Sequence, residues 1–252
     1  MKAAERYDAI EQIVNKEGNT SFATLKKYFP NISDMTLRRD LEYLDRAKRV
    51  IRVHGGVRSV RTTVGTEESY LLRNSLHMES KQLIGEKAAA LLRPNTAIFI
   101  DSGTTTTELC RHIQQEPFLI YTSGITCILE LKRLEKAEIF MVGGHLNVSS
   151  LCTNGSSAIA SIENVHFNLA ILGSTGYDIK NGFTCENAED ARLKREAMKR
   201  ADRSVVLMDS SKVGRTSTYT FAKVDEIDTV VTDDNLDSEL IRHFTKTGTE
   251  LV

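Results

Sequence analysis

The chain has 252 residues, 40% of them hydrophobic and 27% charged, a balance that excludes a disordered or fibrous protein. This length favours two domains over one. No stretch approaches the roughly 20 consecutive apolar residues of a membrane span, and the N-terminal segment lacks the uninterrupted apolar run of a secretory signal. We therefore expect a cytoplasmic protein with no membrane partner.

The net charge of −1 conceals a difference between the two ends of the chain. Residues 1–64 contain 13 Lys and Arg against 8 Asp and Glu, a net charge of +5, which leaves −6 for residues 65–252. A basic segment joined to an acidic one indicates that only the basic part meets a polyanion such as DNA.

The first 60 residues begin with the periodicity of two helices. Ile10 and Val14 lie on one apolar stripe of a predicted helix that ends near Gly18. A second, shorter helix is expected over residues 21–29, because Ser21 is a favourable N-cap and an apolar face follows it.

A third helix is expected after Ser33, which is again a candidate N-cap. Its spacing turns Leu37 and Leu41 inward and leaves Arg38 and Arg39 on the outer face. Two short helices joined by a tight turn, the second of them basic at its start, are typical of a helix-turn-helix. In that motif the second helix enters the major groove of DNA.

Two β-prone runs, residues 49–53 and 57–60, flank a His-Gly-Gly turn and predict a hairpin. A hairpin after a helix-turn-helix is a wing, and its arginines, Arg52 and Arg58, are placed to reach phosphates or a minor groove. The alternatives are a three-helix bundle whose basic face is simply solvated, and a winged helix that binds protein instead of DNA.

The charged side chains of this segment have different expected roles. An arginine can pair with two acceptors of guanine, a contact worth about 1–3 kcal/mol of base discrimination, so we expect Arg38 or Arg39 to read bases. Asp40 is expected to orient an arginine rather than to touch DNA. The other predicted DNA-binding residues, on the DNA backbone or in the wing, are Ser33, Thr36, Arg52, His54 and Arg58.

Residues 61–74 have no strong periodicity and are interpreted as a linker. Beyond them, strand-like runs alternate with helical stretches, which predicts a mainly parallel sheet flanked by helices over residues 75–252. The fold class is therefore α/β, with a small α+β winged helix-turn-helix over residues 1–60. The strand-like runs are residues 97–100, 118–121, 138–142, 169–172, 205–208 and 229–231.

Three loops follow predicted strands, at the ends where parallel sheets bind ligands. They are residues 101–107, 173–178 and 209–214. The first is rich in hydroxyl groups and opens a helix, so it offers N–H and O–H donors to a phosphate. Lys212 in the third loop supplies a cation. Capping of a helix by threonine is the alternative explanation for the first loop.

Cysteine usage favours neither disulfides nor a metal site. Cys110, Cys127, Cys152 and Cys185 lie far apart, form no CxxC pair and have no histidine at metal-binding spacing. We expect four unbridged core residues, with neither a metal nor a cofactor.

The N-terminal motifs resemble those of the DeoR type of bacterial repressor. The run SDMTLRRDL at residues 33–41, followed by RVHGGV at residues 52–57, is similar to the DNA-binding signature of that family. The resemblance implies that Thr36, Arg38 and Arg39 lie on the recognition helix and face DNA.

The resemblance continues through DSGTT at residues 101–105, GFT at residues 182–184 and DSSKVG at residues 209–214. It implies a sensor similar in fold to ribose-phosphate isomerases, sugar-phosphate deaminases and CoA transferases, with a sugar phosphate as the usual effector. A sugar-phosphate isomerase or deaminase with an accessory DNA-binding domain is the alternative function, although we expect no catalysis and assign no catalytic residue.

Carried over to this chain, the resemblance implies that Lys212 neutralises the phosphate, while Asp178, Glu189 and Lys194 meet sugar hydroxyls. Structural ion pairs are the alternative for Glu189 and Lys194, because both lie in a highly charged predicted helix. The loop expected to hold the phosphate comprises Asp101, Ser102, Gly103, Thr104, Thr105 and Thr106.

These observations predict a repressor whose partners are double-stranded operator DNA and a phosphorylated sugar. We expect a homodimer or homotetramer, because two-fold symmetry matches inverted half-sites about 34 Å, or multiples of that distance, apart. The resemblance implies induction by the metabolite, whereas the residues themselves do not fix the sign of the response.

Overall fold

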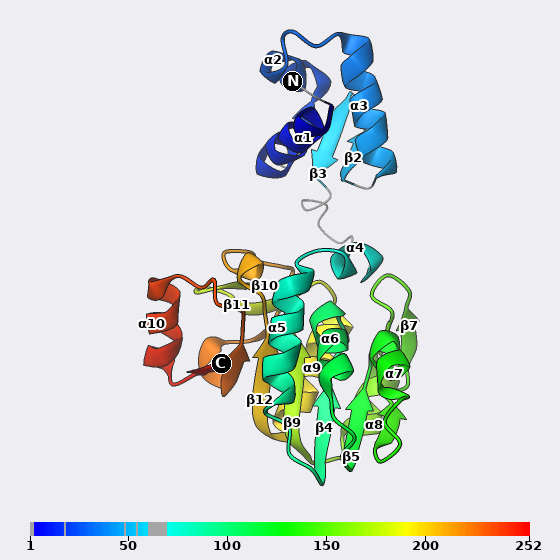
Figure 1. Ribbon diagram of the computed structural model, residues 1–252, viewed down its shortest axis with the longest axis vertical. Coiled ribbons are helices and arrows are strands. Elements are labelled where there is room, and N and C mark those ends of the chain that lie inside the picture. The colour runs from blue at the N-terminus through cyan, green and yellow to red at the C-terminus, as the bar shows by residue number, and fades with distance from the viewer. Residues whose placement is uncertain (1–2, 18, 48, 54, 60–69) are drawn as a thin grey trace. The chain divides into compact units, whose positions relative to one another are not determined.

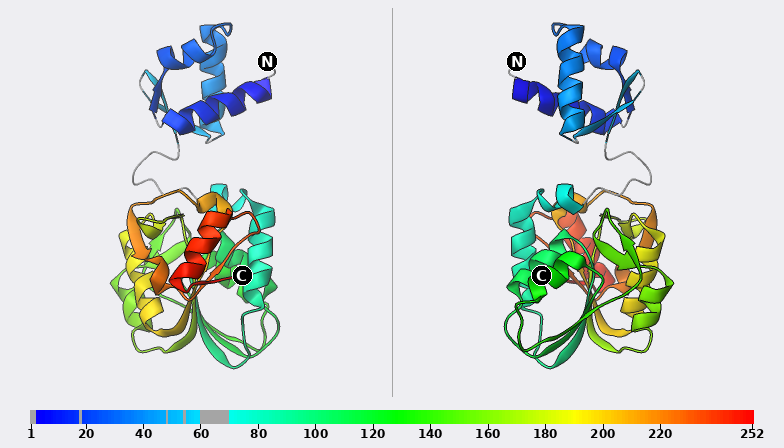
Figure 2. Two further views of the ribbon diagram at one scale, coloured as in Figure 1. Left: turned by 90° about the vertical axis from the view of Figure 1, so that its left-hand side faces the viewer. Right: turned by 90° about the vertical axis from the view of Figure 1, so that its right-hand side faces the viewer.

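The computed structural model describes residues 3–17, 19–47, 49–53, 55–59 and 70–252. The chain divides into two compact units, Met1–Glu68 and Ser69–Val252 (Figures 1 and 2). Each unit contains its own buried apolar cluster. No helix among the described residues is long and apolar enough to cross a membrane.

Three helices of the first unit enclose its core, and the apolar residues that predicted them are buried. Ile10, Leu25 and Leu37 are fully enclosed. Ser21 and Ser33 are the N-caps of the second and third helices, and each side chain accepts a hydrogen bond from a backbone N–H three residues later. The helices are α1 (Ala3–Glu17), α2 (Phe22–Tyr28) and α3 (Asp34–Arg46).

The expected wing hairpin is present, and it gains a third strand that the sequence did not predict. The strands, in the order β1-β3-β2, are β1 (Asn19–Ser21), β3 (Gly56–Ser59) and β2 (Val50–Val53). Thr20 pairs with Val57. A Cβ atom on Gly56 would lie only 2.5 Å from the carbonyl oxygen of Thr20, so this close approach requires glycine. His54 lies outside the described residues.

The second unit is built on a parallel sheet whose strand order is β15-β14-β12-β9-β4-β5-β6. Six of these strands coincide with the strand-like runs of the sequence, and the short edge strand β15 was not expected. The strands are β4 (Thr96–Ile100), β5 (Phe118–Thr122), β6 (Glu138–Met141), β9 (Phe167–Gly173), β12 (Ala201–Leu207), β14 (Thr229–Val231) and β15 (Glu250–Leu251).

Helices cover both faces of the sheet and bury a separate apolar cluster on each (Figures 1 and 2). On one face pack α5 (Met78–Ala89), α6 (Thr104–His112) and α7 (Ile125–Leu131). On the other pack α8 (Ser156–Ile162), α9 (Ala188–Lys199) and α10 (Ser238–Thr247). This arrangement confirms the predicted α/β class with a mainly parallel sheet flanked by helices.

Several short elements are additions to the predicted pattern. Tyr70–Asn74, which we expected within the linker, form helix α4. The strands β10, β11 and β13 form a separate small sheet, and β7 and β8 form a hairpin. These remaining elements are β7 (His145–Asn147), β8 (Cys152–Asn154), β10 (Gly176–Asp178), β11 (Gly182–Cys185), β13 (Tyr219–Ala222) and the 3-10 turns η2 (Ser210–Lys212) and η3 (Val224–Glu226).

Candidate nucleic-acid interface and anion site

The start of α3 is fixed by two hydroxyl side chains. Ser33 Oγ accepts a hydrogen bond from the backbone N–H of Thr36 at 3.1 Å, and the two hydroxyl oxygens lie 2.9 Å apart. Ser33 is exposed and Thr36 is half-buried. Both predicted residues therefore shape the helix terminus and lie within reach of a ligand there.

The two arginines expected to read bases, Arg38 and Arg39, are both exposed on α3. The guanidinium of Arg38 lies over the ring of Phe22 in α2, 4.9 Å from the ring centroid, so the ring orients it. The Arg39 side chain forms no hydrogen bond or ion pair with any other described residue. Arg39 is thus available to bind an external acceptor, and Arg38 is partly positioned in advance.

Asp40 does orient an arginine, as expected, and the partner is Arg6 of α1. Arg6 Nε donates to Asp40 Oδ2 at 2.5 Å and Arg6 Nη2 donates to Oδ1 at 3.0 Å, forming a two-point contact. Both side chains are almost fully buried. The hydrogen bond to Asp40 raises the pKa of Arg6 above its ordinary value. The pair therefore joins α1 to α3 beneath the exposed arginines.

The predicted wing residues are described only in part. Arg52 is exposed, and its guanidinium lies 3.2 Å from a carboxylate oxygen of Glu42 in α3. The backbone of Arg58 pairs with Ile51 in the hairpin, but its side chain, like the whole of His54, lies outside the described residues. Glu42 therefore competes with any phosphate for Arg52.

Sequence reasoning missed one side chain on this surface. Met35, in the first turn of α3, is 66% exposed and lies next to Thr36. An apolar side chain there can contact the methyl group of thymine. The available signal was its position two residues after the cap, since the first turn of a recognition helix reaches base edges.

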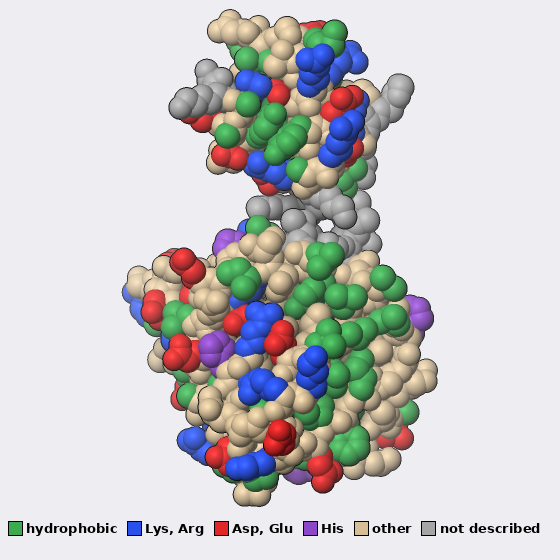
Figure 3. Space-filling view, turned by 45° about the vertical axis from the view of Figure 1, so that its right-hand side comes forward, with side chains coloured by type: hydrophobic (Ala, Val, Ile, Leu, Met, Phe, Trp, Pro, Cys, Tyr) green, Lys and Arg blue, Asp and Glu red, His purple; other side chains and the backbone are tan. Residues whose placement is uncertain are grey.

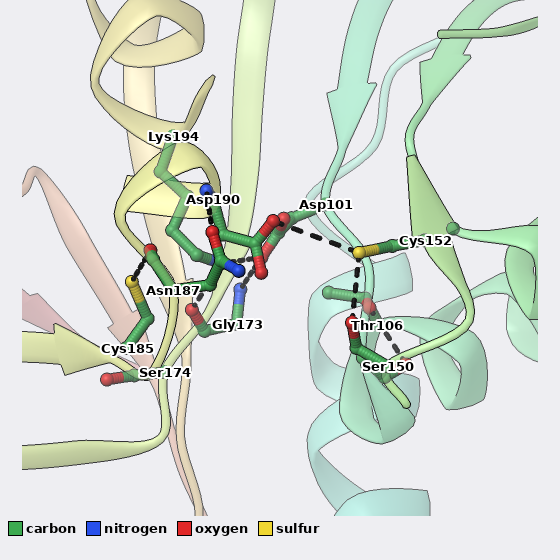
Figure 4. A network of polar contacts seen from close by, with 12 residues as sticks. Asp101, Thr106, Ser150, Cys152, Gly173, Ser174, Cys185, Asn187, Asp190 and Lys194 are labelled. Carbon is green, nitrogen blue, oxygen red and sulfur yellow. Dashed lines mark hydrogen bonds and ion pairs between the residues drawn. The ribbon is translucent and has the colours of Figure 1, made fainter. Parts of the chain in front are cut away.

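In the second unit, Asp101 and Lys194 form a buried ion pair at the end of β4 (Figure 4). The carboxylate of Asp101 also accepts the backbone N–H of Gly173 at 2.9 Å, and Lys194 Nζ donates to the carbonyl of Gly173 at 3.0 Å. Burial is the largest single influence and acts to lower the pKa of Lys194, but the charge and hydrogen bond of Asp101, with Cys185 and Asp190, together raise the pKa above the ordinary value. Two of the predicted residues thus hold the ends of β4 and β9 together.

The hydroxyl-rich loop after Asp101 combines capping with open donors. Thr106 Oγ1 and Thr107 Oγ1 donate to the carbonyl of Gly103 at 3.1 and 2.7 Å, which is the capping role weighed for this loop. Ser102 and Thr105 are half-buried. The first N–H groups of α6 have no intrahelical acceptor and attract an anion. The start of α6 thus offers several donors to one anion.

The loop that contains Lys212 lies at the end of the neighbouring strand β12. Asp209 caps it by accepting the N–H of Ser211 at 3.1 Å, while Oδ2 of Asp209 is buried without a hydrogen-bond partner among the described residues. The N–H of Gly214 donates to the carbonyl of Tyr177 at 2.8 Å, so this loop also meets the β10 segment. The three predicted loops therefore follow the adjacent strands β4, β9 and β12.

Asp178 and Glu189 have local partners. The carboxylate of Asp178 accepts the N–H groups of Lys180 and Asn181 at 2.9 and 2.8 Å and the hydroxyl of Thr216. These bonds lower its pKa to about 2. Glu189 pairs with Arg192 at 3.1 Å. Both carboxylates therefore have structural contacts, and their role toward a sugar stays a prediction.

Sequence reasoning also missed polar residues around the Asp101 pair. Asp190 accepts the side-chain N–H of Asn154 at 2.8 Å and the thiol of Cys152 at 3.8 Å (Figure 4). Burial raises the pKa of the Cys152 and Cys185 thiols to about 12, so both stay protonated. The four cysteines are free and buried, as the spacing indicated. The only sequence signal for Asp190 was the pair of acidic residues in the first turn of the helix that Asn187 caps.

The polar groups at the strand ends of the larger unit differ in the charge that they leave uncompensated. The α6 terminus and Lys212 offer positive charge, whereas the Asp101 and Lys194 charges neutralise each other. Within the described part of the chain, no group of three or more His, Cys, Asp or Glu is placed to hold a metal ion.

Comparison with known proteins gives matches over both units. Residues 6–63 match the DeoR-like helix-turn-helix domain, and residues 76–234 match the DeoR C terminal sensor domain. The chain is 30% identical to the putative aga operon transcriptional repressor of Escherichia coli O157:H7, over 99% of this chain and 93% of that protein. It is 28% identical to the lactose phosphotransferase system repressor of Streptococcus mutans, over 95% of this chain and 96% of that protein.

A solved structure of ribose 5-phosphate isomerase A from Methanocaldococcus jannaschii is also similar. It has 12% sequence identity and a TM-score of 0.40 over 54% of each chain. A likeness of this size carries no conclusion about activity.

Proposed function

The chain belongs to the DeoR family of transcriptional regulators, and from this premise we propose that it represses transcription under the control of a phosphorylated sugar. In this proposal residues 1–60 bind operator DNA and residues 75–252 sense the effector. Residues 61–74, which include α4, connect them.

The exposed pair Arg38 and Arg39 on α3 is the observation that supports specific DNA binding. Both point outward from a helix whose position is fixed by the buried contact between Arg6 and Asp40. A helix held in place by a buried ion pair and carrying exposed arginines suits bidentate recognition of guanine in the major groove. Thr36 and Ser33 at the start of the helix then contact the phosphate backbone.

The effector proposal rests on the open start of α6 beside the loop that contains Lys212. A phosphate matches the N–H groups and hydroxyls of Ser102, Thr104 and Thr105, and Lys212 supplies the opposite charge. The name of the lactose phosphotransferase system repressor supports a sugar-related ligand.

Effector binding lowers operator affinity only if the ligand prefers a conformation of the chain that binds DNA less well. Couplings of this kind are about 1–3 kcal/mol, which corresponds to about 5- to 150-fold in affinity. The test is to titrate fragments of the source genome with the protein, with and without a panel of phosphorylated sugars. A fragment bound selectively and released by one of these sugars supports the proposal, whereas indifference to every sugar contradicts the sensing role.

We further propose that two copies associate through an apolar surface at the β6 edge of the sheet. This surface comprises Leu129, Phe140, Met141, Leu146 and Val148, all 40% or more exposed. Figure 3 shows hydrophobic side chains gathered on one side of the larger unit.

Monomeric proteins rarely leave such a continuous apolar patch beside an unpaired strand edge exposed. A second copy is the occupant that an inverted-repeat operator requires. Sedimentation of Phe140→Asp tests this surface: dissociation to monomers supports it, and an unchanged assembly contradicts it.

Binding without conversion distinguishes this proposal from the isomerase or deaminase alternative. General acid-base catalysis needs a titratable side chain within hydrogen-bond reach of the substrate proton. Asp178 is one candidate for this role, and its carboxylate already accepts several hydrogen bonds within its own hairpin. Incubation with pentose and hexose phosphates should leave each compound unchanged. Turnover of any of them at an enzymatic rate would contradict the repressor proposal.

A further inference from the structure

Lys81 is a buried lysine of α5 that the proposed function does not use. Lys81 is only 4% exposed, although its side chain ends in an ammonium group. It lies in the first turn of α5, the helix that follows α4. Lys81 Nζ donates to the carbonyl oxygens of Arg73 and Leu76, each at 2.5 Å. These carbonyls belong to the last turn of α4 and the residues just after it, so Lys81 holds the end of that helix.

Lys81 also lies beside the anion site. The packing of α5 on α6 brings Gly85 so close that a Cβ atom there would lie 2.9 Å from the backbone of Glu108. Lys81 is one helical turn before Gly85 on the same face of α5. The side chains of Glu108 and Lys212 are both near enough to act electrostatically on its ammonium group.

The negatively charged groups near Lys81 do not offset its burial and the positive charges beside it. Burial lowers its pKa most, the positive charges of Lys212 and Arg73 add to this effect, and Asp209 and Glu108 oppose it; together they give a pKa of about 8. Glu108 is itself paired with Arg111 at 2.6 Å. An added anion in this place would therefore be attracted by Lys81 as well as by Lys212.

We propose that Lys81 is the second cation of the anion site and couples it to α4, because its ammonium group holds the carbonyls of Arg73 and Leu76 and lies one helical turn before the close contact between α5 and α6. This inference rests on the proposed function. A phosphate that draws the ammonium toward itself weakens the hold on α4. Helix α4 is the first described element of the larger unit, so its release alters the part of this unit that is nearest in sequence to the DNA-binding unit.

Hydrogen exchange of the full-length protein tests this coupling, with inorganic phosphate as the probe. In the wild type, saturating phosphate should slow exchange in residues 102–107 and 209–214 and speed it severalfold in residues 70–76. In Lys81→Met, residues 70–76 should already exchange rapidly without phosphate, and phosphate should bind about tenfold more weakly. Lys87→Met, on the same helix but paired with Asp234, is the matched control and should behave as the wild type.

Two further measurements separate coupling from a merely structural role. Lys81→Arg keeps the charge and should retain most of the phosphate affinity. Sulfate, which does not titrate near pH 8, should cause uptake of up to about half a proton by the wild type at that pH and almost none by Lys81→Met, because a bound anion restores the lysine proton.

The outcomes distinguish this inference from the function on which it rests. Phosphate protection of residues 102–107 with unchanged exchange in residues 70–76 overturns the coupling alone. Equal phosphate affinity and equal proton uptake in wild type and Lys81→Met also overturn it. If phosphate protects neither loop in the wild type, both the anion site and the coupling are wrong.

Discussion

Each unit of this protein contains a buried pair between a carboxylate and a cation, and the two pairs differ in where they lie relative to the candidate site. Arg6 and Asp40 join α1 to the buried face of α3 and do not contact the exposed arginines, Arg38 and Arg39, as hydrogen-bond or ion-pair partners. Asp101 and Lys194 lie among the loops of the proposed anion site. The comparison teaches that the smaller unit keeps its supporting pair apart from the residues proposed to recognise DNA, whereas the larger unit places its supporting pair among the residues proposed to bind the effector.

The largest expected effect comes from Asp40→Ala. It leaves the buried guanidinium of Arg6 without its partner, which typically costs about 3–5 kcal/mol. Thermal and denaturant unfolding should show early loss of the smaller unit and of DNA binding, with effector binding preserved. Glu42→Ala, which removes an exposed ion pair of the same helix, should cost at most about 1 kcal/mol. Equal losses in the two variants would contradict the supporting role of Asp40.

Lys194→Met should destabilise the larger unit by about 3 kcal/mol, because the carboxylate of Asp101 is then buried without its cation. Adding Asp101→Asn in the same chain should recover part of this loss, since the uncompensated charge is removed. Arg192→Met removes the exposed pair with Glu189 and is the control, with an effect near zero. Denaturant unfolding of the wild type, Lys194→Met, Asp101→Asn and the double variant measures the coupling; strictly additive losses would show that Asp101 and Lys194 do not depend on each other.

Arg38→Ala and Arg39→Ala should reduce discrimination between operator and random DNA by about 1–3 kcal/mol, or about 5- to 150-fold. The protein should keep its fold, because both side chains are exposed. Arg46→Ala, at the far end of α3, should weaken both kinds of DNA similarly or not at all. Competition binding at fixed salt measures the ratio, and unchanged specificity in both test variants would refute the recognition role of α3.

The smallest effect is expected for Lys212→Ala. Its side chain is half-buried, so loss of its contact to a phosphate should weaken effector affinity by about 1 kcal/mol, roughly fivefold. Operator affinity without effector should stay unchanged. A full response at wild-type effector concentrations would remove Lys212 from the anion site.

The sequence predicted the elements that have long apolar periodicity and missed those that depend on contacts. Local sequence pattern predicted the helices that contain Ile10, Leu25 and Leu37, and six strands of the sheet. In these elements the spacing of the apolar residues matches the residues that are buried in the structure. Strand β1 was missed because three residues are too few to show an alternating pattern of apolar and polar side chains. The strand forms only because it pairs with β3 of the wing. The roles of Lys81 and Asp190 depend on distant partners that no spacing reveals.

The most direct test of the account is binding of the purified full chain to fragments of its source genome, at moderate ionic strength, with and without phosphorylated sugars. The account predicts selective retention of one or a few fragments, and a fall in their affinity of about 5- to 150-fold with one phosphorylated sugar. Equal affinity for every fragment would contradict the account.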